Sequence, residues 1–189
     1  MKINVAKKII SLKPKAKPDC VIGIDPDAVK SGIAFLEIAT RKLECTTLRF
    51  CDLMEYLKWA KGVAESKSQS FVVVIEGGWL NAGNWHLPKV CSKQKAAAQG
   101  RSVGMNHQTG LLIAEFCEHH GIPFEIVKPL QKIWRGHDRK ITHDELVAIC
   151  DPDHVLTRTN QEQRDAALLA WWYAGLPIRI TKTKNNDKR

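Results

Sequence analysis

The sequence contains no closely spaced cysteine pair and no long apolar run. Its six cysteines, among 189 residues, are widely separated and include no C-x-x-C motif. This spacing argues against a zinc site and against the disulfide framework of a small secreted protein. No apolar stretch approaches the roughly 20 residues that span a membrane, and the N-terminus has no small-residue cleavage site. We therefore expect no membrane association, reduced thiols, and a location in the cytoplasm, or in the host-cell cytoplasm if the protein is viral.

Acidic residues are absent or scarce at both ends of the chain. Residues 1–18 contain six lysines and no acid, and residues 179–189 carry a net charge of +4. Subtracting these ten charges from the total of +9 leaves −1 for residues 19–178. The distribution predicts a basic N-terminal arm (1–18), one folded domain (19–178) and a basic C-terminal tail (179–189), with a polyanion as partner.

Acids are also missing from residues 77–114, where four basic residues and several aromatics occur. Residues 126–141 add five basic residues against one acid. Such segments can hold nucleic-acid phosphates without reading bases, although most charge runs are only solvated faces. The candidate contacts are Lys89, Lys93, Lys95, Arg101, Lys132, Arg139 and Lys140.

The hydrophobic pattern predicts an α/β domain in the order β-β-β-α-β-α-β-α-α. The first three strands, at 20–25, 32–38 and 42–50, are expected to form an antiparallel meander. A continuous apolar strand at 71–76 follows a helix over 52–64, and residues 77–100 are expected to be irregular. A helix over 102–120, a strand at 124–127, a helix from Thr142 and a last helix capped by Asn160 complete the prediction.

Four acids stand out by position: Asp25, Glu76, Glu162 and Asp165. Asp25 and Glu76 each end an apolar strand, and Glu162 and Asp165 share a face near the start of the last helix. Clustered carboxylates suit Mg²⁺, with Mn²⁺ as a substitute, and two such ions can promote phosphodiester cleavage. Individually, each acid could instead be a turn residue or a partner of a helix dipole.

These motifs resemble those of the RuvC family of Holliday-junction resolvases, in the RNase H-like superfamily. The first signature, G-x-D-P, is present at residues 23–26, and S-G-I-A follows at residues 31–34. The second acid ends V-V-V-I-E at Glu76, and the third signature, acid-x-x-Asp-Ala, occupies residues 162–166. The resemblance spans about residues 20–175 in the family's order and spacing.

The resemblance implies an RNase H-like mixed sheet of about five strands flanked by helices. It also implies a homodimer, two Mg²⁺ ions per site, no small-molecule cofactor, and paired nicks in four-way DNA junctions that leave 5′-phosphates. Carried over by position, Asp25, Glu76, Glu162 and Asp165 are the catalytic metal ligands. Trp79, three residues after the second acid, corresponds to an aromatic that stacks in the opened junction; its alternative is a packed loop aromatic.

This chain departs from the family pattern at three places. Asp27 replaces the usual Gly after D-P and is either a turn residue or a further carboxylate beside the site. Glu162 replaces a common Asp. The family's lysines match Lys132 and Lys140 only loosely, and we expect Lys132 to stabilise charge on the scissile phosphate.

Three other functions remain open from the sequence. They are an RNase H-like nuclease acting on another nucleic acid, a non-catalytic junction-binding protein, and an actin-like or sugar-kinase ATPase. The ATPase is disfavoured, because the chain is too short for a second lobe and lacks the Gly-rich phosphate loops.

Overall fold

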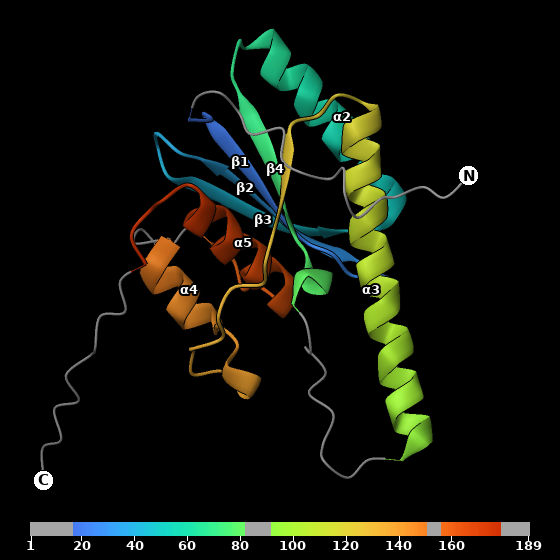
Figure 1. Cartoon of the computed structure of the whole chain (residues 1–189). Helices are drawn as coiled ribbons and strands as arrows, with labels where there is room; N and C mark the ends of the chain where they lie inside the picture. Colours follow the sequence, from blue (N-terminus) through green and yellow to red (C-terminus); the bar gives the residue numbers. More distant parts are fainter. Residues whose placement is uncertain (1–16, 82–91, 151–155, 179–189) are drawn as a thin grey trace, which may run out of the picture.

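A computed structural model describes residues 17–81, 92–150 and 156–178. A five-stranded mixed sheet forms its centre, in the order β3-β2-β1-β4-β5 (Figure 1). The strands are β1 (Cys20–Asp25), β2 (Ser31–Glu37), β3 (Lys42–Leu48), β4 (Phe71–Glu76) and β5 (Phe124–Val127). β1, β2 and β3 form the predicted antiparallel meander, and β4 and β5 run parallel to β1. This is the mixed sheet of about five strands flanked by helices that the motif resemblance implied.

Helices cover both faces of the sheet (Figure 1). One apolar cluster joins the sheet to α2 (Phe50–Ser66) and α3 (Lys93–His119). A second cluster joins the other face to α4 (His143–Cys150) and α5 (Gln161–Tyr173). Alternate residues of β1 serve the two clusters, with Val21 in one and Ile22 in the other. Because helices cover both faces of the sheet, every side chain of β1 and β4 except the last is buried, and their sequences are continuously apolar instead of alternating.

The long helix α3 begins nine residues before its predicted start. The expectation of irregular structure over 77–100 was wrong for this part, where the Ser92 side chain accepts a hydrogen bond from Lys95 N and caps the helix. Residues 78–80 also form a short 3-10 helix, η1. The first buried residue of α3 is Gly110, so the first part carries no apolar periodicity. Three consecutive alanines (96–98), which favour helix strongly, were the signal available there.

The predicted starts of the last two helices are confirmed. Thr142 N donates to Glu145 Oε2 and Glu145 N donates to Thr142 Oγ1, at 3.0 and 3.2 Å. The capping box of α5 joins Asn160 and Gln163 in the same reciprocal way. These caps hold the amino-terminal ends of α4 and α5 in place.

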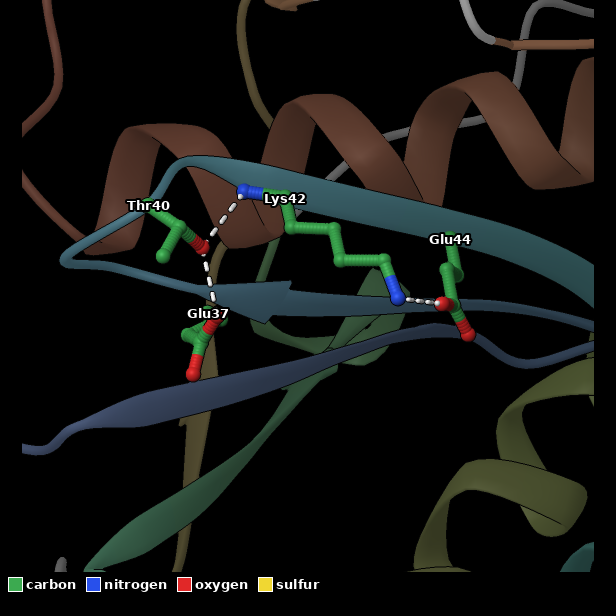
Figure 2. A network of polar contacts seen from close by, with 4 residues as sticks. All are labelled: Glu37, Thr40, Lys42 and Glu44. Carbon is green, nitrogen blue, oxygen red and sulfur yellow. Dashed lines mark hydrogen bonds and ion pairs between the residues drawn. The ribbon is translucent and has the colours of Figure 1, made fainter.

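The β2–β3 hairpin turn is closed by a small polar network (Figure 2). Thr40 Oγ1 donates to Glu37 and accepts from Lys42 N. Lys42 Nζ forms an ion pair of 2.7 Å with Glu44 Oε1. Both acids of this turn therefore have partners.

None of the helices in the described ranges is long and apolar enough to cross a membrane. The predicted arms fall almost wholly outside those ranges, which leave out residues 1–16 and 179–189.

Candidate active site

The first two acids lie on adjacent parallel strands. β1 pairs with β4 in a register that places Ile24 opposite Ile75. The next residues, Asp25 and Glu76, therefore leave the sheet side by side at the carboxyl ends of the two strands. Both carboxylates are half-buried.

Two glycines allow α5 to bring the other two acids to the same place. A Cβ on Gly32 would lie 2.0 Å from the carbonyl oxygen of Glu162, and one on Gly23 would lie 2.3 Å from that of Ala166. No side chain fits at either point, so the helix backbone rests directly on β1 and β2. Gly23, in G-x-D-P, and Gly32 therefore position the helix that carries Glu162 and Asp165.

The four acids line one open cavity of about 240 Å³. Two basic candidates, Lys132 and Lys140, also line the cavity. Asp27 lines it as well. Pro26, the last residue of the G-x-D-P signature, lines it as well. Sequence reasoning missed the other lining residues, for which the sequence shows no distinguishing pattern: Asn106, Leu130, Gln131, Trp134, Ile141 and Leu168.

The acids at this cavity disfavour one another's charge. Burial raises the pKa of Asp25 well above its usual value, and the carboxylates of Glu76, Asp165 and Glu162 raise it further. Burial, followed by Asp165, raises the pKa of Glu76 to about 7. Burial likewise raises the pKa of Asp165. Lys140 opposes all three shifts but does not cancel them.

Three of the four acids have no neutralising contact. Within the described ranges, no donor forms a hydrogen bond or an ion pair with Asp25, Glu76 or Glu162, whereas Asp165 Oδ1 accepts from Gln161 Nε2 at 2.7 Å. Hard carboxylate oxygens without partners are the donors that a divalent cation prefers, so the donor chemistry fits one. In the same ranges, however, no three His, Cys, Asp or Glu side chains converge as a ready set of metal ligands.

A tightly folded loop presents the second lysine. Trp134 N donates to Arg139 O and Gly136 N donates to Lys140 O, and the Trp134 ring is buried in the core beneath. Asp138 and Arg139 both adopt positive φ, at 53° and 59°. This turn sends Lys140 toward the cavity, whereas Arg139 is exposed and does not line it.

Trp79 packs against α3 rather than lining the cavity. A Cβ on Gly110 would lie 2.6 Å from the Trp79 ring, and the His107 ring stands edge-on to it at 5.9 Å between centroids. Trp79 is half-buried against the core cluster beneath α2 and α3. The structure therefore gives it the packing contacts of the alternative interpretation, and its stacking on a base stays a prediction.

The remaining basic candidates lie on α3 or outside the described ranges. Lys93, Lys95 and Arg101 are exposed on the first part of α3. Lys89 lies outside the described residues. None of the three on α3 lines the cavity.

Asp27 is a turn residue that also fastens the loop after Asp25. Its Oδ1 accepts from the backbone N–H groups of Val29 and Lys30, at 2.8 and 3.2 Å. Its Oδ2 accepts from Asn106 Nδ2 of α3 at 3.1 Å, and Asn106 Oδ1 accepts from Ala28 N at 3.0 Å. This residue thus ties the loop to α3 instead of adding an unpaired carboxylate.

The sequence matches no family model and no curated protein. Among solved structures, the chain is similar to T. thermophilus RuvC in complex with a Holliday junction substrate. That match has a TM-score of 0.45 and 14% sequence identity, and covers 80% of this chain and 89% of the other.

Proposed function

We propose that this protein is a divalent-metal-dependent endonuclease that cuts branched DNA, with the four-way junction as its substrate. The observation that carries the proposal is that four carboxylates from three elements line one cavity, and that three of them have no hydrogen-bond or ion-pair partner in the described part of the chain. Buried acids without partners destabilise a fold. Their retention beside two lysines is what a site for cations and phosphate requires.

Asp25, Glu76, Glu162 and Asp165 would hold the cations. Mg²⁺ held by these residues would supply Lewis acidity for phosphodiester hydrolysis. The protein itself orients the reacting strand. Lys140 and Lys132, which also line the cavity, would contact the non-bridging oxygens of the scissile phosphate and stabilise the charge that develops on them.

The choice of DNA over another ligand follows from the surroundings of the cavity. Its lining is mostly polar and charged, with no closed apolar chamber for a small molecule. Lys93, Lys95 and Arg101 leave the first part of α3 basic and exposed, suited to phosphate contacts. The motif resemblance to RuvC resolvases narrows the substrate to a four-way junction. It also supports a homodimer, because symmetric paired nicks need two sites.

The test is a cleavage assay with a synthetic mobile four-way junction, in Mg²⁺, in Mn²⁺ and in chelator. We expect symmetric paired nicks with 5′-phosphate ends in either metal and none in chelator. A flap, an RNA–DNA hybrid and a linear duplex serve as competing substrates. Preferential cutting of the hybrid would assign a different RNase H-like nuclease, and tight junction binding without product in either metal would refute the enzyme proposal.

A further inference from the structure

Gln161 makes the one hydrogen bond that reaches any of Asp25, Glu76, Glu162 and Asp165 in the described ranges. It lies four residues before Asp165 on α5, so both side chains share a helix face. Its Nε2 donates to Asp165 Oδ1 at 2.7 Å. The contact restrains one oxygen of the carboxylate and leaves the other without a protein partner.

A neighbouring arginine determines which way the Gln161 amide points. Gln161 Oε1 accepts from Arg164 Nη2 at 2.9 Å. A guanidinium group only donates hydrogen bonds, so the amide oxygen must face Arg164. The amide nitrogen is then forced toward Asp165, whose ionised carboxylate only accepts. Arg164 and Asp165 therefore both require the same orientation of the Gln161 amide.

Arg164 is itself anchored to backbone on two sides. Its Nε donates to Ile141 O at 2.8 Å, and its Nη1 donates to Thr159 O. Ile141 is buried and directly follows Lys140, which lines the cavity. The relay from Ile141 through Arg164 and Gln161 therefore connects the lysine loop to Asp165.

We propose that Gln161 is a positioning residue that orients the Asp165 carboxylate for cation binding. By occupying Oδ1 it presents Oδ2 to the cavity as a single ligand atom, and Arg164 locks the amide that does so. Gln161 lies just before the acid-x-x-Asp-Ala signature from which the site was inferred, and Arg164 occupies one of its unspecified positions. The inference rests on the proposed function, because it assumes that a divalent cation binds at these acids.

The test compares two glutamines of the same helical turn. Gln161→Met removes the amide while keeping the length of the side chain. Gln163→Met is the matched control, because the Gln163 side chain belongs to the capping box and accepts from Asn160 N instead of contacting Asp165. Mn²⁺ binding to the full chain is measured by calorimetry, and junction cleavage is measured over a range of Mg²⁺ concentrations.

We expect Gln161→Met to weaken Mn²⁺ binding about tenfold, as loss of a hydrogen bond to a ligand typically does. The Mg²⁺ concentration for half-maximal cleavage should rise by a similar factor, with a smaller change in the rate at saturating Mg²⁺. Gln163→Met should lower Tm but leave both metal readouts unchanged. If Gln161→Met does not fold, Gln161→Asn, whose amide is one methylene too short to reach Asp165, should show the same loss.

Equal metal binding by Gln161→Met and the wild type would overturn the positioning role while leaving the nuclease proposal intact. Failure of the wild type to bind Mn²⁺ or to cleave would instead overturn the proposed function. A parallel loss in Gln161→Met and Gln163→Met would also reject the inference, because it would reduce Gln161 to a helix-stabilising residue.

Discussion

Acids at the two ends of this sheet have opposite surroundings. In the β2–β3 turn, Glu44 is 62% exposed and paired with Lys42, and Glu37 accepts a hydrogen bond from Thr40 (Figure 2). At the carboxyl ends of β1 and β4, Asp25 and Glu76 are half-buried and have no hydrogen-bond donor in the described part of the chain. The hairpin acids therefore have partners within the protein, whereas the cavity acids are available to a bound cation.

The contrast separates structural carboxylates from candidate functional ones. An exposed ion pair such as Lys42–Glu44 contributes about 0–1 kcal/mol and can be lost at little cost. Unpaired buried acids that raise one another's pKa reduce stability, so the fold alone gives no reason to keep them. The cavity acids are therefore where substitutions should affect function most.

The largest difference between the cavity acids and the hairpin acids is expected in the effect of substitution on the cleavage rate. Asp25→Asn removes one cation-binding charge with almost no change in shape. We expect junction cleavage to fall at least about 10³-fold, which corresponds to about 4 kcal/mol of lost transition-state stabilisation, while junction binding is retained. Single-turnover cleavage and a gel-shift assay measure the two effects.

The matched control for that change is Glu44→Gln, an equally conservative substitution in the hairpin turn. Its cleavage rate should stay within about twofold of the wild type, because the pair it breaks is exposed. Cleavage by Asp25→Asn at the wild-type rate would show that the cavity acids are no more functional than those of the turn.

The second difference concerns how closely helix and sheet approach at the cavity. Gly32→Ala would place a Cβ against the backbone of Glu162, so α5 must shift. We expect a loss of about 2–3 kcal/mol in unfolding free energy and at least a tenfold loss of cleavage, since Glu162 moves with the helix. Denaturant unfolding and the cleavage assay measure both.

Gly62→Ala provides the control for backbone effects of the substitution. Gly62 lies in α2, and a Cβ there would meet nothing within 4 Å. Alanine should raise stability by about 0.5–1 kcal/mol through helix propensity, with cleavage unchanged. If Gly32→Ala were equally harmless, close packing of α5 on β2 would not be what positions Glu162.

The smallest difference is expected in the pH dependence of stability without metal. The pKa of Glu76 rises from 4.5 to about 7 on folding. Between these pH values the folded state keeps a proton that the unfolded chain has released, so stability falls as the pH rises through this window. Glu76→Gln does not titrate. The full shift corresponds to roughly 3 kcal/mol, and screening by water at the half-buried Glu76 reduces it. In chelator at pH 8 the variant should therefore be more stable than the wild type by about 2 kcal/mol, or roughly 4–8 °C in Tm.

The hairpin again supplies the control, because Glu44→Gln should change Tm little at either pH. Thermal unfolding at pH 5 and pH 8 in chelator measures these shifts. Equal pH slopes for the wild type and Glu76→Gln would show that Glu76 is neither buried nor repelled in solution, and the contrast between cavity and turn would fail at this residue.

Much of the fold followed from local sequence. The apolar runs ending at Asp25 and Glu76 predicted the two central strands, and the capping patterns at Thr142 and Asn160 predicted where α4 and α5 begin. The start of α3 was missed because hydrophobic periodicity reports only burial, and the residues before Gly110 are not buried. The Gln161–Arg164 relay was missed for a different reason. One of its ends is the backbone of Ile141, 23 residues away, and no sequence pattern marks that contact.

The sequence by itself determined which acids and bases are present and which of them end strands or share a helix face, because these properties depend on neighbours in the chain. Only the tertiary structure decided that Asp25, Glu76, Glu162 and Asp165 line one cavity, that Lys140 reaches it while Arg139 does not, and that Trp79 packs on α3. Those outcomes depend on close approaches between distant segments, above all α5 against Gly23 and Gly32. The sequence shows glycine at these two positions, but only the folded structure shows that α5 packs there too closely for a Cβ.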